Sequence, residues 1–357
     1  MRQLYCIGIC MRFCLLGCLL TSVFLVVGSQ PIPTFAYSDY TDVTATLTDL
    51  AATNTDVAYL FSIGTTYQGR QQWVLRVTSD VDGTVANNKP AVWFSCGIHA
   101  RERMVPQVGL AFATYLCQNK NDPAIESLLH NLDIYIMPMG NPDGVEYNGC
   151  CQSTTCWRRN MELHHERAFE SIVPAVGAGV DPNRTWDYEW DYAGGAKIDQ
   201  MVTYRGEQPM ITPEIRNIRR FTNSLPLLVA NIDWHSASGS VYYSWNGNYD
   251  DVNNVFHRNV IMSIAQGFAK ITGYIAKEGN LLYLSTGDTE DSDEALGGII
   301  ALTIEVLGVV DGLNPNFTCE LFTPPYPSPQ STADINNNVQ AAIYVLNIVN
   351  NGPYKSY

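Results

Sequence analysis

Apolar and polar residues follow two different rhythms along this chain, and each rhythm predicts a kind of element. Runs that are apolar throughout predict buried strands, whereas apolar residues that recur every three or four positions predict amphipathic helices. Strands are expected over residues 58–65, 72–79, 91–96, 131–139, 225–233 and 298–306, and helices over residues 35–55, 106–117, 123–130, 250–271 and 328–349, with one more from residue 213. Apolar strands alternating with helices predict a single-domain α/β fold with a mixed, mostly parallel twisted sheet and helices on both faces.

Turn and capping residues mark several boundaries between these elements. The turn Tyr67-Gln-Gly69 predicts a hairpin between the first two strands. Asp122-Pro123 and Thr212-Pro213 place a capping side chain before a proline, which predicts helix starts. Asn141-Pro-Asp-Gly144 predicts a turn. Residues 145–206 are irregular and polar, and loops of this length are usually functional.

The N-terminal residues differ from the rest of the chain. Arg2 and Arg12 precede an uncharged apolar stretch over residues 13–27, and small residues follow it. This order predicts a secretory signal peptide over residues 1–29; the alternative is an uncleaved anchor, for which the apolar stretch is short. We therefore expect a secreted protein with one domain over residues 30–357.

Charge narrows the possible partners. The chain carries 35 acidic and 21 basic residues, a formal net charge of −14. Such a surface repels phosphate backbones, so we expect no nucleic-acid partner. Beyond the signal no stretch is long and apolar enough to cross a membrane, so no membrane partner is expected after cleavage. The sequence leaves the oligomeric state open.

Cysteines and sequons fit a secreted protein. Six cysteines remain after the signal: Cys96, Cys117, Cys150, Cys151, Cys156 and Cys319. They permit up to three disulfides whose pairing the sequence does not decide, with a local bridge expected in the crowded loop and a metal site there as the alternative. Asn316-Phe-Thr318 is a candidate glycosylation site.

Three expected strands carry a reactive residue at or just after their carboxyl ends. These residues are His99, His235 and Glu305, and Glu102 follows His99 three positions later. Ligands of open α/β sheets bind in the crevice outside the carboxyl ends of the strands, so the four side chains are expected to meet there. A charged Glu305 in an apolar strand needs a partner, because an unpaired buried charge costs several kcal/mol.

A metal site explains this set of side chains. His99, Glu102 and His235 offer the nitrogen and oxygen ligands of one catalytic zinc ion, and Glu305 can act as the general base. Each residue alone has a plainer interpretation: a chance HxxE match, a buried core histidine, or an ion pair at a strand end.

Six separated blocks of the chain resemble the zinc carboxypeptidases of the A and B type, over roughly residues 35–350. The blocks are Gly97-Ile-His99-Ala-Arg101-Glu102, Asn141-Pro-Asp-Gly144, Trp157-Arg158-Arg159-Asn160, Gly179-Val-Asp181-Pro-Asn183-Arg184-Thr-Trp186, Trp234-His235-Ser236 and Ile304-Glu305. The resemblance implies that family's fold and one zinc ion per chain.

The resemblance also implies roles for residues around the metal. Arg158 matches the arginine that polarises the scissile carbonyl and stabilises its oxyanion. Asn183, Arg184 and Tyr283 match the groups that bind the terminal carboxylate of a peptide. A glycan on Asn183, which lies in a sequon, would block the site, so none is expected there.

Two further matches concern the neighbourhood of the zinc ligands, and two positions depart from the family. Arg101 matches a residue that contacts the peptide upstream, and Asp181 matches a carboxylate that orients His99. Ala237 and Arg103 stand where the family commonly has aromatic residues, and Ala237 is expected to widen an upstream subsite.

Glu290 falls where the family keeps the base of its specificity pocket, when residues are counted without gaps from Tyr283 to Glu305. B-type enzymes carry an acid there, so Glu290, aided by Asp288, is expected to select C-terminal Lys or Arg. The alternative is that the acids of residues 288–294 form a solvated loop and do not line the pocket.

The sequence thus predicts a secreted zinc exopeptidase acting on the C-termini of peptides and proteins. A preference for hydrophobic C-terminal residues, a zinc amidase or deacylase, and a non-catalytic binding protein are the alternatives. Few residues separate the predicted signal from the region of resemblance, so we expect activity without removal of an inhibitory pro-domain.

Overall fold

The computed structural model describes most of the chain after its N-terminal residues. The described residues are 37–79, 81, 89–150, 156–162, 179–199, 201–247, 255–295, 298–306 and 321–352. The predicted signal peptide, the sequon at Asn316 and Cys319 lie outside them.

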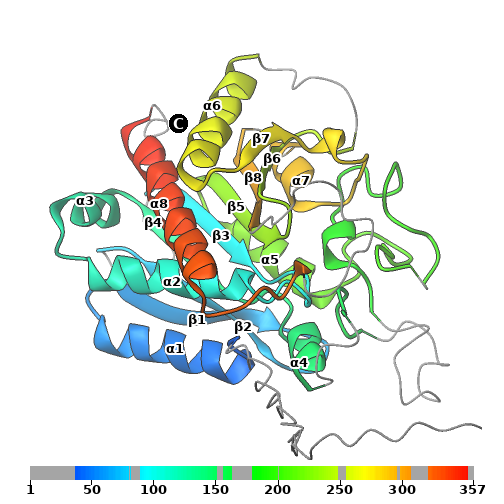
Figure 1. Cartoon of the computed structure of the whole chain (residues 1–357), viewed down its shortest axis with the longest axis horizontal. Coiled ribbons are helices and arrows are strands. Elements are labelled where there is room, and N and C mark those ends of the chain that lie inside the picture. Colours follow the sequence, from blue (N-terminus) through cyan, green and yellow to red (C-terminus); the bar gives the residue numbers. More distant parts are fainter. Residues whose placement is uncertain are drawn as a thin grey trace, which may run out of the picture. The chain divides into compact units, whose positions relative to one another are not determined.

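An eight-stranded mixed sheet forms the centre of the domain (Figure 1). Its strands are β1 (Ala58–Thr65), β2 (Gln71–Val77), β3 (Ala91–Cys96), β4 (Asp133–Met137), β5 (Leu228–Ser236), β6 (Ser240–Tyr243), β7 (Ile275–Glu278) and β8 (Ile300–Val306). Their order is β1-β2-β4-β3-β5-β8-β6-β7. The four central strands β4, β3, β5 and β8 are parallel, and antiparallel pairs flank them. The predicted mixed sheet is confirmed.

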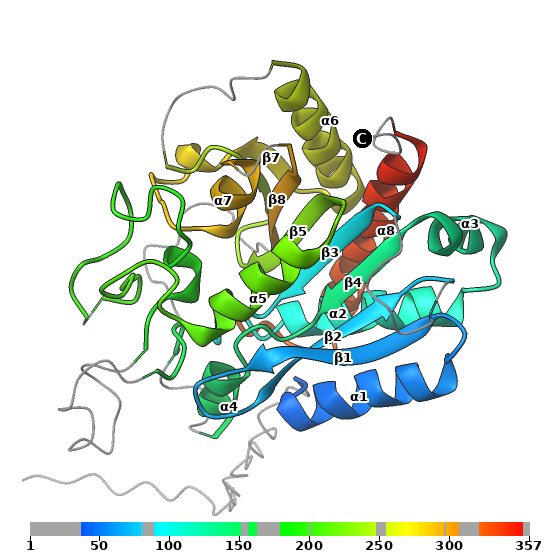
Figure 2. The same ribbon diagram turned by 180° about the vertical axis from the view of Figure 1, so that it is seen from behind.

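Helices cover both faces of this sheet. They are α1 (Tyr40–Thr53), α2 (Val105–Gln118), α3 (Pro123–Asn131), α4 (Pro142–Cys150), α5 (Pro213–Ser224), α6 (Val255–Thr272), α7 (Thr289–Ala295) and α8 (Pro329–Asn351), with the 3-10 turns η2 (Pro182–Arg184) and η3 (Gly279–Leu281). Helices α1, α2 and α8 lie in front of the sheet in Figure 1. The view from behind in Figure 2 shows α5 and α7 on the other face.

The central strands are apolar because both of their faces are buried. Every residue of β3 is buried. On one face Phe94 stacks on Trp234 with ring centroids 5.3 Å apart, and on the other Trp93 contacts Phe221 of α5 at 5.5 Å. Aromatic side chains of this size bury enough apolar surface to dominate the packing of a core. A large core lies between the sheet and helices α2, α6 and α8, and a smaller one lies under α5.

Local sequence signals predicted most element starts, with some corrections. The hairpin of β1 and β2 and the Asp122 cap of α3 are confirmed. Thr212 precedes α5 as expected, but its side chain makes no capping bond. The turn predicted at Asn141-Pro-Asp-Gly144 is wrong: the segment opens helix α4, and Asn141 Oδ1 accepts the amide of Gly144 at 3.0 Å. Pro142 then stands at the first helical position, which proline favours.

Two cysteines can be assigned from the structure. Cys96 and Cys117 are buried and free, so these two do not contribute to the disulfides that the cysteine count permitted. The bridge expected in the loop of Cys150, Cys151 and Cys156 stays a prediction, because most of that loop lies outside the described residues. Among the helices that the structure describes, none is long and apolar enough to cross a membrane.

Glu214, in the first turn of α5, should make stability depend on pH. Its carboxylate is buried, and its Oε2 accepts a bond from Asn160 Nδ2 at 2.9 Å, while its Oε1 has no partner among the described residues. Burial raises the pKa of Glu214 from 4.5 to about 7. The folded state therefore holds a proton that the unfolded state releases, so stability falls as pH rises from about 4.5 to about 7, by up to about 3 kcal/mol.

We expect Glu214→Gln to remove this loss, because a neutral amide keeps the bond from Asn160 without a titrating proton. Thermal unfolding at pH 5 and pH 8 measures it: the variant should lose less stability than the wild type between the two values and be the more stable at pH 8. An unchanged difference between the two pH values would show that Glu214 does not titrate in this range.

Candidate active site

Three neighbouring parallel strands bring the predicted reactive residues to one edge of the sheet. The turn that follows β3 carries His99 and Glu102, and β5 lies directly beside β3. In the register of β5 and β8, His235 is opposite Glu305. Residues more than two hundred positions apart are therefore neighbours, because parallel strands end at the same edge.

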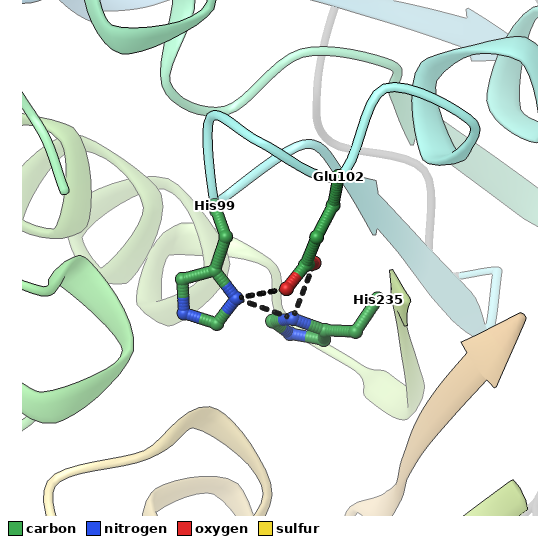
Figure 3. A group of neighbouring side chains, drawn as sticks. All are labelled: His99, Glu102 and His235. Carbon is green, nitrogen blue, oxygen red and sulfur yellow. Dashed lines mark hydrogen bonds and ion pairs between the residues drawn. The ribbon is translucent and has the colours of Figure 1, made fainter. Parts of the chain in front are cut away.

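His99, Glu102 and His235 form a compact group of buried side chains (Figure 3). Oε1 of Glu102 lies 2.8 Å from His99 Nδ1, and its Oε2 lies 3.1 Å from His235 Nδ1. The two Nδ1 atoms are 2.9 Å apart. One ligand atom from each residue lies within 4.8 Å of the others, which is the size of a metal site.

A carboxylate holds the far side of each imidazole ring. His99 Nε2 lies 3.1 Å from Asp181 Oδ1, and His235 Nε2 lies 3.0 Å from Asp233 Oδ2. When Nε2 of a neutral ring donates to a carboxylate, Nδ1 carries the lone pair. Two lone pairs and a carboxylate that converge on one point repel each other unless a cation lies between them. The donor set of two nitrogens and one carboxylate fits zinc.

The charges around this point keep Glu102 anionic. Burial by itself raises the pKa of Glu102, but His99 and His235 outweigh it and lower the pKa below its usual value. Burial likewise opposes the charge of His235, yet Asp233 and Glu102 raise the pKa of His235 well above its usual value. The raised pKa of His235 reflects the negative charge of Asp233 and Glu102 around it, and such charge attracts a cation.

Asp181 connects three parts of the site. Besides His99, it accepts a bond from Arg158 Nε at 2.8 Å and one from the backbone amide of Asn183 at 3.0 Å. Burial disfavours its charge, but Arg158 and His99 lower the pKa of Asp181 well below its usual range. Arg158 Nη1 lies 3.7 Å from Glu102 Oε1. The guanidinium is thus fixed beside the metal ligands.

A cavity of about 70 Å³ opens directly on this group. The predicted residues that line it are His99, Arg158, Asn183, Arg184, His235, Tyr283, Glu290 and Glu305. Glu305 is half-buried in its wall, and burial together with the charge of Glu102 raises the pKa of Glu305 to about 7. A carboxylate with such a pKa can exchange protons with a substrate near neutral pH.

Arg184 and Asn183 line the cavity and are buried, at 4% and 6% exposure. Arg184 Nη2 donates to the hydroxyl of Tyr283, which is 45% exposed at the mouth of the cavity. Nε of Arg184 has no partner among the described residues. Arginine, amide and phenol donors therefore converge where an anionic group of a ligand can bind.

Glu290 differs from the other acids of residues 288–294. These acids are buried, so the alternative of a solvated acidic loop is wrong. Each of the other four acids has a polar partner. Asp288 accepts the hydroxyl of Ser285, and Asp291 accepts the amides of Asn246 and Gly247. Asp293 pairs with Arg219, and Glu294 pairs with His257. Glu290 is 2% exposed and lines the cavity, and neither of its oxygens has a well-aligned hydrogen-bond partner among the described residues. The side chains of Thr303 and Asn246 lower the pKa of Glu290, but burial and Asp288 outweigh them.

Arg101, Glu102 and Asp181 are the predicted site residues that do not line this cavity; Glu102 and Asp181 contact residues that do, whereas Arg101 packs elsewhere. Its guanidinium lies over the ring of Phe322, 4.0 Å from the centroid. Arg101 still interacts with the charges of the site. Burial and the charge of Arg158 lower the pKa of Arg101 to about 10, and Glu102 opposes this shift.

Sequence reasoning missed Asp233, which is buried and holds His235. A signal was present, because Asp233 is an acid at the end of an apolar strand, as Glu305 is. A charged side chain in such a strand needs a partner, and this holds for Asp233 as it does for Glu305. It also missed β6, β7 and α7, whose short segments lack a clear period.

Comparisons with known proteins agree with this geometry. The family model described as zinc carboxypeptidase matches residues 43–339. The chain is 28% identical over 277 residues to a zinc carboxypeptidase of Saccharothrix mutabilis subsp. capreolus, covering 74% of this chain and 61% of that one. It is 28% identical over 286 residues to carboxypeptidase B of Astacus astacus (76% and 86%) and 29% identical over 270 residues to carboxypeptidase A2 of Rattus norvegicus (73% and 60%).

The fold also matches solved structures. Bovine thrombin-activatable fibrinolysis inhibitor, solved in complex with tick carboxypeptidase inhibitor, superposes with a TM-score of 0.72 and 22% identity, over 88% of this chain and 97% of that one. The chain spans only about 60% of the bacterial relative and of the rat A2 relative. Since the family model covers most of the chain and a His-Glu-His site for its metal is present, the chain belongs to the zinc carboxypeptidase family.

Proposed function

We propose that this chain is a secreted zinc exopeptidase that removes C-terminal Lys or Arg from peptides and proteins. The observation that supports it best is that one cavity is lined by the metal ligands His99 and His235, by the donors Asn183 and Arg184, and by the carboxyl group of Glu290. Secretion is supported by the signal pattern of residues 1–29.

The donors at the cavity wall recognise the end of a peptide chain. A terminal α-carboxylate is planar and anionic, and a guanidinium binds it through parallel hydrogen bonds. Arg184 supplies that group, Asn183 adds an amide, and Tyr283 closes the mouth with its hydroxyl. An internal peptide bond has no such carboxylate, so the reaction is limited to the last residue.

The reacting groups surround the scissile bond of a peptide held in this way. His99, Glu102 and His235 would hold a zinc ion, which would supply the Lewis acidity that polarises the carbonyl and makes a water molecule acidic. Glu305 takes the proton of the attacking water and delivers it to the leaving amine. Arg158, fixed by Asp181, stabilises the negative charge that develops on the carbonyl oxygen.

The charge of Glu290 favours a basic C-terminal residue. A buried carboxylate without a donor is costly, and an ammonium or guanidinium group of the substrate relieves that cost. A hydrophobic side chain gains nothing from this carboxyl group, whereas a cationic one gains an ionic partner, which disfavours the alternative of an A-like preference. The intact set of carboxylate-binding residues disfavours an amidase or deacylase.

A panel of peptides that differ only in the last residue tests the proposal. Peptides ending in Lys, Arg, Phe or Glu and a Lys peptide with an amidated C-terminus are incubated with the enzyme, with and without a chelator. Lys and Arg should be released faster than Phe and Glu, the amidated peptide should be spared, and chelation should stop the reaction until zinc is restored. Faster release of Phe would refute basic specificity, and cleavage of the amidated peptide would point to an amidase.

Asp233→Asn should weaken zinc binding about 10- to 100-fold, because a partner that orients a metal-bound histidine is lost. Competition with a chelator measures this affinity without any substrate. Asp187→Asn is the control, since Asp187 is an exposed acid that does not contact the metal ligands. Equal zinc affinity in wild type and Asp233→Asn would show that Asp233 does not hold His235 in the metal-bound protein.

A further inference from the structure

Thr289, the first residue of α7, lies between Asn183 and Asp233, which belong to two different parts of the site. Its side chain is 3% exposed. The hydroxyl lies 2.9 Å from Oδ1 of Asn183 and 3.1 Å from Oδ2 of Asp233. Its backbone amide also donates to Asn183 Oδ1, at 3.0 Å. One side chain therefore touches both a group that binds the substrate carboxylate and the group that holds a metal ligand.

The bonds from Thr289 decide how the amide of Asn183 is oriented. Oδ1 accepts the backbone amide of Thr289, so the donor Nδ2 must point the other way, towards the cavity. The hydroxyl of Thr289 has one hydrogen, which it can give to Asn183 Oδ1 or to Asp233 Oδ2 but not to both at once. There it lies 3.5 Å from His235 Nε2. With the opposite orientation the carbonyl oxygen of Asn183 would face the anionic end of a substrate and repel it.

Asp233 is fixed by donors on both of its oxygens. Oδ1 accepts the hydroxyl of Ser95 at 2.8 Å, and Oδ2 faces both His235 and Thr289. A carboxylate that is fully paired in a buried site keeps one position, and so does the histidine that it holds.

A purely structural role for the hydroxyl does not account for these contacts. Capping of α7 is supplied by Asp288, whose Oδ1 accepts the amide of Asp291 at 3.2 Å. The hydroxyl of Thr289 is thus not needed to start the helix, and it points at the site instead.

We propose that Thr289 is a positioning residue, which couples the orientation of Asn183 to that of the metal ligand His235 through Asp233. The part of this inference that concerns Asn183 and the substrate rests on the proposed exopeptidase function. The metal half, which concerns His235 and the binding of zinc, does not depend on any substrate. Because one hydroxyl contacts both Asn183 and Asp233, its removal should have an effect at both sites.

The test compares Thr289→Val, which removes the hydroxyl at nearly constant shape, with Thr289→Ser, which keeps it. With a peptide ending in Lys, Thr289→Val should raise KM about tenfold, the effect of losing one buried hydrogen bond to a group that binds a charge. Its zinc affinity, measured by chelator competition, should fall by about three- to tenfold, less than for Asp233→Asn. Thr289→Ser should restore both values.

Thr272→Val is the matched control. Thr272 is also buried, but its hydroxyl donates only to carbonyls of its own helix, Phe268 and Ala269. It should leave KM and zinc affinity at wild-type values, although it lowers the melting temperature. If Thr289→Val behaves like Thr272→Val, Thr289 has only a packing role and the inference is wrong.

A double-mutant cycle with Asn183→Ala isolates the coupling. In that background Thr289→Val should raise KM no further, because the amide that Thr289 orients is gone, while zinc affinity should still fall. Additive effects on KM would contradict the inference. If the wild type releases no C-terminal residue, the proposed function fails, whereas the zinc affinities of the Val and Ser variants still decide the metal half.

Discussion

Glu305→Gln should lower kcat about a thousandfold on a peptide ending in Lys while leaving zinc bound. Glutamine has nearly the same shape but cannot take a proton from water, and general-base catalysis contributes about 10²- to 10⁴-fold. Glu305 lines the cavity without belonging to the three metal ligands, so KM and zinc affinity should change little. Steady-state kinetics and zinc content per chain measure the two quantities on the same sample.

The control for this prediction is Glu126→Gln, since Glu126 lies in the first turn of α3, exposed to solvent and far along the chain from the site. It should keep wild-type kcat. A Glu305→Gln enzyme with full turnover would refute the role of Glu305, and loss of zinc together with activity would instead make it part of the metal site.

Glu290→Gln should lower kcat/KM for peptides ending in Lys or Arg by about 10²- to 10³-fold and reduce the preference over Phe. Removing one partner of a buried charge pair costs about 2–5 kcal/mol, because the other charge stays desolvated. The neutral amide removes the charge at the base of the pocket but keeps its volume, so release of Phe should change little. The ratio of kcat/KM for the Lys peptide to kcat/KM for the Phe peptide measures the effect. A change in the catalytic groups would alter both values alike and leave this ratio unchanged.

Glu294→Gln is the matched control, because Glu294 lies on the same helix but pairs with His257 and does not line the cavity.

The pH dependence of the preference for Lys over Phe is a second readout of Glu290. Burial and the neighbouring Asp288 raise the pKa of Glu290 to about 8, so binding of a cation must release a proton. The Lys-to-Phe ratio should therefore rise as pH increases towards 8 in the wild type and stay flat in Glu290→Gln. A ratio that Glu290→Gln leaves unchanged would show that another group reads the C-terminal residue.

Hydrophobic periodicity and short motifs were sufficient for the main elements of this fold. The buried strands β3, β5 and β8 read as apolar runs, because strands covered on both faces cannot carry polar residues without a reason. The same rule made Glu305 stand out. It applied equally to Asp233, which was passed over because no motif named it.

Short and locally ambiguous segments were the ones that sequence reasoning missed or misread. Asn141-Pro-Asp-Gly144 has the composition of a turn and of a helix start, and only its position after β4 made it the start of α4. Residues 288–294 look like a solvated acidic loop, but tertiary donors from other elements satisfy most of these acids and allow them to be buried.

The sequence by itself determined that strands and helices alternate and that His99, His235 and Glu305 lie at strand ends, because side-chain periodicity and the parallel sheet are local rules. Only the tertiary structure decided which atoms meet: that Asp233 holds the imidazole of His235, that Thr289 lies between Asn183 and Asp233, and that Glu290 alone among its neighbouring acids has no well-aligned hydrogen-bond partner among the described residues. These contacts depend on the distances between segments far apart in the chain, which no local pattern records.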